Sequence, residues 1–474
     1  FRRVLFRSRQ HARLANLRLV AFAATIAVAW LAFARHTLSP GWLLACAAGF
    51  GALVVWHAKV LNTLERGVRA RRLYETALLR LDGKWAGLGP DGSRFVSGHR
   101  FAGDLDLFGP ASLFQFLNTT KTESGEEVLA SWLREPAAPP EVLARQAAID
   151  ELRPRLDFRE DLAVLAAEAH IGRTSALTTW SASQPAGLTP RTAWILAASA
   201  ATSVMMVTLG LTERISFGWT LSWLLIQWGL LSRFKRRIEA VASAIDTPSY
   251  DLQLLQELLE RLEREPFTTG RLTAIRAALV STGAPPSRRI ARLRTLISLL
   301  ESEHNPYFQL SGLAFVLLIK PQAATAIDRW HAAHGPALGS WLQAVGELEA
   351  LAALATYAYE HPSDPFPDLA EPGAGPLLEA DALGHPLIHE TAVVRNDVRL
   401  GRTSPRVLIV SGSNMSGKST LLRTVGINAV LALAGAPVRA ASLSLTPLAL
   451  GATLRIQDSL QEGRSRFYAE ITRI

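Results

Sequence analysis

Nine consecutive residues near the C-terminal end of the sequence have the types and spacing of a phosphate-binding loop. They are Gly412, Ser413, Asn414, Met415, Ser416, Gly417, Lys418, Ser419 and Thr420. Glycines let the backbone curl so that successive N–H groups point at phosphate oxygens, and Lys418 adds a positive charge facing the β- and γ-phosphates. The Ser419 hydroxyl can bind Mg²⁺, which bridges the same oxygens. The pattern therefore predicts a site for ATP and Mg²⁺.

The residues on either side predict the strand, loop and helix order that such a loop requires. Arg406–Val410 is a short apolar, β-branched run, which favours a buried parallel strand. A helix is expected from Thr420 to about Ala434, ended by Gly435, and its positive N-terminal end adds to anion binding. The alternative is a glycine loop with an unrelated lysine. The order of the three elements disfavours it.

Proline and glycine predict a domain border upstream of this unit. Two segments, at 361–368 and 371–376, interrupt the helical pattern, so an α/β P-loop NTPase domain, incomplete at its C-terminal end, is expected over residues 371–474. Residues 76–190 and 238–370 predict the two parts of a mainly α-helical core. A stripe of period near 3.6 marks its buried face: Leu252, Leu254, Leu255, Leu258, Leu259 and Leu262. Thr122 is expected to cap a helix that follows it.

Apolar runs predict two transmembrane helical hairpins, in residues 1–75 and 191–237. Hydrophobic residues make up 49% of the chain and charged residues 19%, below the roughly 25% typical of soluble domains. The uncharged runs are Leu19–Ala34, Leu38–Trp56, Thr192–Thr212 and Ile215–Ser232. Each is near the lower length limit for a membrane span. The alternative is that they are buried helices of a soluble core.

Lysine and arginine set the expected orientation of these hairpins. Basic residues precede and follow each hairpin in the sequence. This predicts a multi-pass protein of an inner or plasma membrane with its soluble parts in the cytoplasm.

The net charge of +9 suits a polyanion, whether nucleic acid, nucleotide or an anionic membrane leaflet. The single cysteine, Cys46, excludes an intramolecular disulfide, and it has no cluster of Cys or His around it for zinc.

Motifs in the same order as those of the MutS family of DNA mismatch repair ATPases extend over roughly 104–474. Asn414 and Met415 within the loop resemble the distinctive loop of that family, and 385–388, 396–397 and 458–470 resemble the segments around it. The upstream positions that resemble the MutS core are Leu113 to Asn118, Thr122, Gly125, Leu129, Trp132, Leu133, Pro136, Arg145, Gln146 and Gly346 to Glu349. The chain is identified on this basis as a member of the family.

The resemblance implies an ATPase that works as a homodimer through its ATPase domains and acts on DNA. Lys418 and Ser419 would bind phosphates and Mg²⁺ within one subunit. Ser465, at an expected helix start, would reach the γ-phosphate of the partner's nucleotide, where a helix N-terminus favours negative charge. For Asp458 a role at the site and a role as a solvated acid or helix cap are both open.

Several departures from the family pattern limit what the resemblance implies. A membrane hairpin takes the place of a mismatch-reading domain, and the second hairpin lies where the DNA-gripping clamp is expected. Val393 stands where an adenine-stacking aromatic is expected. We therefore expect any DNA binding to discriminate weakly between sequences or mismatches. The sequence begins at Phe1 and ends at Ile474 inside an amphipathic pattern, so we expect a fragment, without the catalytic carboxylate that positions Mg²⁺ and water.

Two other classes of protein remain as alternatives. One is an ABC-type transporter, because a P-loop ATPase joined to membrane helices has the composition of an exporter half. The splitting of the hairpins by helical core and the Glu462-Gly-Arg-Ser465 segment disfavour it. The other is a nucleotide-gated structural protein that binds ATP without useful turnover and without recognising mismatches.

Overall fold

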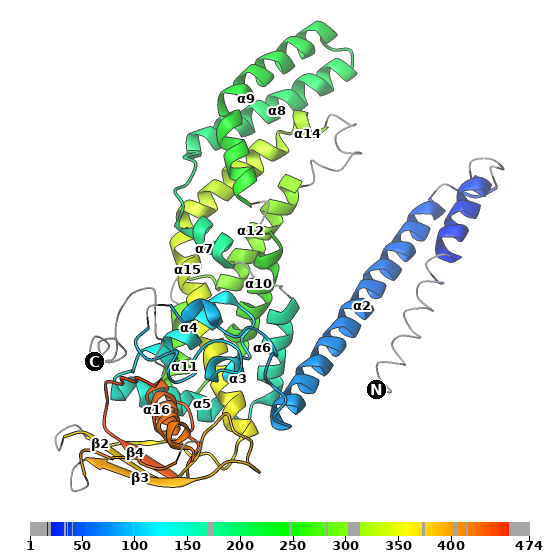
Figure 1. Ribbon diagram of the computed structural model, residues 1–474. Helices are drawn as coiled ribbons and strands as arrows, with labels where there is room; N and C mark the ends of the chain where they lie inside the picture. Colours follow the sequence, from blue (N-terminus) through cyan, green and yellow to red (C-terminus); the bar gives the residue numbers. More distant parts are fainter. Residues whose placement is uncertain are drawn as a thin grey trace, which may run out of the picture. The chain divides into compact units, whose positions relative to one another are not determined.

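The computed structural model describes residues 17, 20–32, 35, 37–39, 41–97, 99–168, 174–245, 249–280, 283–301, 313–371, 375–401, 405–413 and 416–454. The chain divides into two units, Phe1–Asp82 and Gly83–Ile474, and each is described by itself. The first unit contains a helix at Val20–Ala32 and the long helix α2 at Trp42–Leu81 (Figure 1). Beyond Trp56, α2 becomes polar and carries ion pairs between residues four apart, Glu65 with Arg69 and Arg71 with Glu75.

The second unit is mainly helical, as the sequence predicts. Its helices are η1 (Ser93–Phe95), α3 (Leu113–Leu117), α4 (Glu123–Arg134), α5 (Pro139–Leu152), α6 (Leu156–Glu168), α7 (Thr174–Ala182), α8 (Pro190–Leu211), α9 (Phe217–Ile245), α10 (Ser249–Arg264), α11 (Gly270–Val280), α12 (Pro286–Glu301), α14 (Leu313–Val316), α15 (Ile319–Glu360) and α16 (Lys418–Ala434). Its strands are β1 (Asp368–Leu369), β2 (Leu377–Leu383), β3 (Asn396–Gly401) and β4 (Ser442–Leu445).

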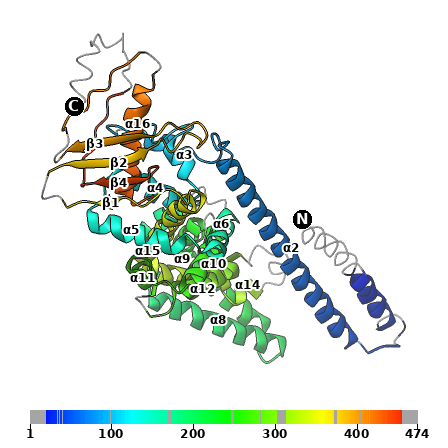
Figure 2. The same ribbon diagram turned by 90° about the horizontal axis from the view of Figure 1, so that it is seen from below.

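The strands form a small mixed sheet with α16 lying over it (Figures 1 and 2). Its order is β1-β4-β2-β3, with β1 parallel to β4 and β2 antiparallel to both β3 and β4. In this register Leu378 pairs with Leu400 on one side and with Leu445 on the other. Gly401 ends β3 at φ +88°, and a Cβ there would lie 1.8 Å from the Pro376 carbonyl oxygen, so only glycine fits.

One predicted strand is absent from the described part of the chain. Arg406–Val410 forms no described strand, and Val407 and Ile409 are 73% and 85% exposed. The prediction of a buried parallel strand at these residues was therefore wrong for this structure. A β-branched run becomes a buried strand only when neighbouring strands form hydrogen bonds with its N–H and C=O groups. The described strands β1 to β4 pair with one another and not with this run.

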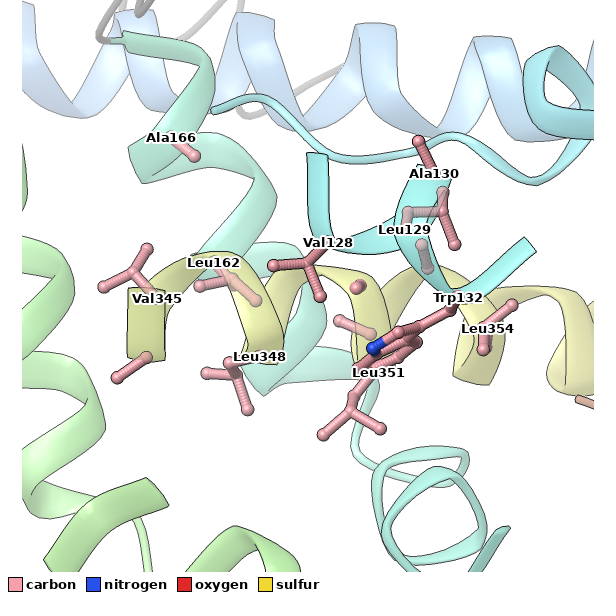
Figure 3. Close-up of a cluster of buried hydrophobic side chains, with 14 of the residues drawn as sticks. Val128, Leu129, Ala130, Trp132, Leu162, Ala166, Val345, Leu348, Leu351 and Leu354 are labelled. Atoms are coloured by element: carbon pink, nitrogen blue, oxygen red, sulfur yellow. The ribbon is translucent and has the colours of Figure 1, made fainter. Parts of the chain in front are cut away.

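The long helix α15 forms the axis around which the core is built (Figure 1). It contacts α4, α5, α7, α8, α9, α11 and α12 along its length. The predicted leucine stripe of α10 is buried, which confirms its assignment to the core. Figure 3 shows Val128, Leu129 and Trp132 of α4 facing Leu348 and Leu351 of α15.

Helix α4 packs closely against α15. The residues at this close contact are among those singled out in the sequence. Thr122 caps α4, as predicted, by accepting a hydrogen bond from the Gly125 N–H at 3.0 Å. A Cβ on Gly346 would lie 2.7 Å from the Ser124 carbonyl carbon. Glu349 is fully buried and accepts hydrogen bonds from the Thr122 hydroxyl and from the N–H groups of Lys121 and Thr122. Burial raises the pKa of Glu349, and these donors oppose that rise.

Helices α8 and α9 form an antiparallel pair that extends from one end of the core (Figure 1). Two helices of the described residues, α2 and α8, have the length and composition to cross a membrane. Only 6% and 22% of their most apolar windows are buried within the protein, whereas a helix of a soluble core is mostly buried. Helix α9 continues past the predicted end at Ser232 to Ile245, where Ile238 and Val241 join the main core. Membrane crossing stays a prediction.

Candidate functional site

The predicted phosphate-binding loop leads directly into α16. Gly417 is the N-cap residue at φ +87°, a left-handed conformation that glycine adopts without strain, and the helix begins at Lys418 rather than at Thr420. The Lys418 ammonium donates to the carbonyl oxygens of Gly412 and Ser413, at 2.7 and 2.5 Å. The lysine therefore curls back over its own loop.

The described residues of the loop are exposed and rich in hydrogen-bond donors, as binding of a phosphate group requires. Ser413, Ser416, Ser419 and Thr420 are exposed, and the Leu421 N–H bonds to the Gly417 carbonyl at 2.9 Å, which closes the first turn of the helix. The N–H groups before Leu421 belong to the first turn, whose donors have no partner within a helix. With the helix dipole and the Lys418 charge, these donors fit phosphate, and the Ser419 hydroxyl beside them suits Mg²⁺.

Some predicted site residues lie outside the described residues. These are Asn414 and Met415 in the loop, and Ser465 and Asp458 in the downstream segment. The structure therefore brings together Gly412, Ser413, Ser416, Gly417, Lys418, Ser419 and Thr420 at the start of α16. Val393 lies against the turn after β2, because a Cβ on Gly384 would come within 3.1 Å of its Cγ2 atom. The described residues contain no group of His, Cys, Asp or Glu side chains able to hold a metal ion.

A buried histidine supports the side of α16 that faces the core. His385, in a segment singled out in the sequence, is 8% exposed after the end of β2. Burial and the nearby Arg423 guanidinium lower its pKa to about 4, and Asp106 opposes them. Arg423 of α16 donates to the Asp104 carbonyl oxygen at 3.0 Å and pairs with Asp106 at 3.4 Å. These contacts attach the helix that follows the loop to the segment preceding α3.

A buried polar network joins α16 to the C-terminal end of α15. The Asn428 side chain donates to the Gly384 carbonyl oxygen at 3.0 Å and accepts from the Arg439 N–H at 2.8 Å. The Arg439 guanidinium donates to both Asp364 carboxylate oxygens, at 3.2 and 3.3 Å, and also bonds to Glu390. Tyr357 of α15 donates its hydroxyl to Asp364 at 2.8 Å. Burial, and next the Asp364 charge, raise the pKa of Tyr357 well above its usual value.

The far end of α16 is attached to α5 by Arg145, a residue that the resemblance to MutS singles out. Arg145 donates to the Ala434 carbonyl oxygen at 3.3 Å, and its guanidinium lies 4.1 Å from the centre of the Trp132 ring. Gln146 donates to the Pro367 carbonyl oxygen at 3.1 Å. Gly435 ends α16 at φ +90°, where a Cβ would lie 2.8 Å from the Arg145 Cβ atom. Both ends of α16 are therefore held by the helical core.

Sequence reasoning missed the network of Asn428, Arg439, Asp364, Tyr357 and Glu390. Asp364 lies in the segment interpreted as a linker, and the other residues carry no motif. A charged residue within an apolar run was the available signal: Arg439 stands among Ala436, Val438 and Ala440, all buried. A charge in such a place requires a buried partner.

Comparisons with known proteins agree with these motifs. Residues 408–474 match the family described as MutS domain V. A probable DNA mismatch repair protein Msh6 of Drosophila melanogaster is 29% identical over 194 residues, which is 40% of this chain and 16% of that protein. The DNA mismatch repair protein MutS of Solibacter usitatus is 30% identical over 168 residues, covering 33% of this chain and 18% of that protein.

The corresponding MutS protein of Symbiobacterium thermophilum is 33% identical over 142 residues, which is 28% of this chain and 15% of that protein. The chain thus spans less than a fifth of the length of these curated relatives. The matched region at 408–474 begins within the apolar run before the loop and includes Lys418, Ser419 and Ser465. These matches and the order of the motifs support the MutS family for this chain.

Proposed function

We propose that this chain is the membrane-anchored part of a MutS-type ATPase, in which the loop at Gly412–Thr420 binds ATP with Mg²⁺. The observation that supports this most is the start of α16. An exposed glycine-containing loop, the N-terminus of a 17-residue helix and the Lys418 ammonium all meet there. The relatives are named as DNA mismatch repair proteins, which supports a role in that process.

Each loop residue has a role that follows from its chemistry. Lys418 would exchange its contacts with the loop carbonyls for oxygens of the β- and γ-phosphates. The N–H groups from Gly417 to Thr420 would donate to the same phosphates, and the Ser419 hydroxyl would hold Mg²⁺. Mg²⁺ would supply charge neutralisation between the phosphate groups. Ser465 of one chain acts on the γ-phosphate bound by a second copy, so the functional unit is a homodimer formed through the ATPase domains.

The membrane anchor is proposed from the apolar helices. The exposed side chains of α8 and α9 include Trp194, Trp219 and Trp228, at 77%, 70% and 65%, which in water would form a large unfavourable surface. A bilayer removes this cost, and tryptophan favours the interfaces of a membrane. The basic residues at the base of the pair support a cytoplasmic position for the core, and with it for the ATPase domain.

DNA is proposed as a partner that is bound mainly through its phosphates. The net charge of +9 supports salt-sensitive binding to the phosphates of DNA. A mismatch reader needs an inserted side chain and a domain that holds bent DNA. The apolar pair α8–α9 extends from the core at the chain position where the family's clamp is expected, so we propose that mismatch discrimination is weak or absent in this chain.

A nucleotide titration tests the ATP site. The detergent-solubilised chain is titrated with a fluorescent ATP analogue in the presence of Mg²⁺, beside the variants Lys418→Ala and Lys84→Ala. Lys84→Ala removes an equal charge from a different exposed position and is the matched control. We expect Lys418→Ala to abolish binding, since it removes the point charge that faces the phosphates, and Lys84→Ala to bind like the unmodified chain. Equal affinity of the chain and Lys418→Ala overturns the assignment.

A further inference from the structure

The register of the helix pair α8–α9 shows which residues of the two helices lie at the same level along the pair. Three contacts set this register: Ser199 with Gln227 at 3.3 Å, Trp223 with Ser203 at 2.9 Å, and Thr220 with the Met206 carbonyl oxygen at 3.2 Å. Continued toward the base of the pair, the same antiparallel register puts Arg191 opposite Lys235. Arg233, Arg236 and Arg237 lie at nearly the same level, and all five basic side chains belong to exposed residues.

These five residues are named here the basic collar: Arg191, Arg233, Lys235, Arg236 and Arg237. From the collar to the end of α8 at Leu211 the pair extends about 30 Å at about 1.5 Å per residue, which matches the hydrocarbon thickness of a bilayer. Anionic headgroups are the natural partners of a basic collar at that level. The collar therefore marks the expected cytoplasmic surface of the membrane.

A third apolar segment lies beyond the collar, on its membrane side. The Phe315 carbonyl oxygen accepts a hydrogen bond from the Gln227 side chain at 2.8 Å, and Gln227 lies opposite Ser199, about 12 Å beyond Arg191 along α8. Leu318 is 1% exposed and packs on Leu196 and Ala200. The short helix α14 and the start of α15 are thus held at the depth of the apolar pair.

Helix α15 crosses the level of the collar a short distance further along. The Asp328 carboxylate accepts hydrogen bonds from the N–H groups of Ala186 and Leu188, at 2.6 and 2.7 Å, and these residues precede Arg191 on the core side. Leu318 lies on one side of the collar level and Asp328 lies on the other. Residues 313–319 were interpreted from the sequence as part of the soluble core, but these contacts place them beyond the collar.

The segment has the features that a bilayer demands of irregular backbone. A helix as short as α14 leaves carbonyl groups without partners inside the helix, and hydrocarbon offers no water to satisfy them. The fully buried amide of Gln227 supplies the missing donor to Phe315. Leu318 has φ +52°, an uncommon left-handed conformation that lets the chain turn sharply from α14 into α15. The side chains of Phe315 and Leu317 remain exposed, at 36% and 38%.

We infer that Leu313–Ile319 enters the bilayer beside α8 and α9 as a short re-entrant segment, with its Phe315 carbonyl satisfied by Gln227. This inference rests on the proposed membrane anchor and goes beyond it. The partner is the acyl region of a phospholipid bilayer. The long core helix α15 then begins inside the membrane, so any motion of α15 is passed to this segment directly.

Spin-label accessibility in the full chain tests the inference. Cys46→Ser removes the native cysteine, and single cysteines are then introduced by Leu317→Cys, Ile195→Cys and Ser298→Cys. Ile195 is an exposed residue of α8 close to the depth of Leu317, and Ser298 is an exposed residue of α12 in the core. Each nitroxide-labelled protein is reconstituted in vesicles of phosphatidylcholine and phosphatidylglycerol. Relaxation by oxygen, which concentrates in lipid, is compared with relaxation by a water-soluble nickel chelate.

The inference predicts that the labels at 317 and 195 both lose relaxation by the nickel chelate and gain relaxation by oxygen, while the label at 298 behaves oppositely. If the label at 195 is in lipid and the label at 317 is in water, the re-entrant segment is overturned and the anchor stands. If both labels are in water, the anchor and the inference both fall. Gln227→Leu should increase nickel relaxation at 317 and leave 195 unchanged, and an unchanged label at 317 would contradict the role given to this amide.

Discussion

Substitution of Gly346 by alanine tests the close crossing of α4 and α15, because the structure gives this position little room. A Cβ there would lie 2.3 Å from the Ser124 Oγ atom and 2.7 and 2.8 Å from the Ser124 carbonyl carbon and oxygen. The hydroxyl can rotate away, but the backbone cannot, because Thr122 and Glu349 hold the start of α4. The added methyl group must therefore push the two helices apart.

The expected magnitude is the difference between two opposing terms. Overpacking of this kind costs about 1–3 kcal/mol, toward the upper end where backbone must move. Alanine regains about 1 kcal/mol of helix propensity over glycine. Gly346→Ala should therefore lower the free energy of unfolding by about 1–2 kcal/mol. Gly339→Ala in the same helix is the matched control, since its Cβ would meet only the Ser181 hydroxyl at 4.0 Å, and it should be neutral or stabilising by up to about 1 kcal/mol.

Thermal unfolding of the detergent-solubilised chain, followed by tryptophan fluorescence, compares the variants. The melting temperature should fall for Gly346→Ala and stay equal or rise for Gly339→Ala. Equal melting temperatures for Gly346→Ala and the unmodified chain would show that α4 and α15 do not approach as closely as described. A fall for both variants would show that α15 needs flexibility at its glycines rather than space.

Further predictions concern two subjects: the residues that attach α16 to the core, and the binding of DNA. Because the pKa of His385 is lowered to about 4, its neutral imidazole stabilises the folded chain fully above about pH 6.5. As the pH falls from 6.5 toward 4, the free energy of unfolding should decrease by about 3 kcal/mol in all. In His385→Gln the melting temperature should depend less on pH over this range. Arg439→Met leaves the buried Asp364 carboxylate without its cation and should cost about 3–5 kcal/mol in chemical denaturation, whereas adding Asp364→Asn should recover much of that loss. Gly435→Ala forces a left-handed φ and a contact with Arg145, and should lower the melting temperature more than Gly451→Ala, whose Cβ meets no atom within 4 Å. Homoduplex and single-mismatch DNA should bind with equal affinity at about 0.15 M salt, and a tenfold preference, about 1.4 kcal/mol, would show a reading module that these residues do not reveal.

The parts of the fold that could be predicted from the sequence are those with a local physical signature. The leucine stripe of α10 has the helical period, so its burial follows from that pattern alone. The Thr122 cap and the end of α16 at Gly435 depend on residues close together in the sequence, and both predictions are confirmed. The helical core is confirmed for the same reason, since its periodic segments are long.

The features that could not be predicted depend on contacts between distant segments. Arg406–Val410 has the composition of a strand, but pairing decides whether such a run is buried, and composition does not reveal the partners. The network around Arg439 joins residues that lie far apart in the sequence, so no spacing rule indicates it. Leu313–Val316 is too short for its sequence to indicate a membrane segment, and its contact with Gln227 joins residues that are distant in the sequence.

Hydrogen exchange of the reconstituted chain, with and without a non-hydrolysable ATP analogue and Mg²⁺, tests whether the loop at Gly412–Thr420 binds nucleotide. We predict slower exchange of the amides from Gly412 to Leu421, because phosphate oxygens accept hydrogen bonds from the loop and the first turn of α16. We predict no such change in Lys418→Ala. The variant Lys84→Ala should be protected like the unmodified chain. Nucleotide binding that leaves these amides unprotected, or that protects them equally in Lys418→Ala, would show that the phosphates bind elsewhere.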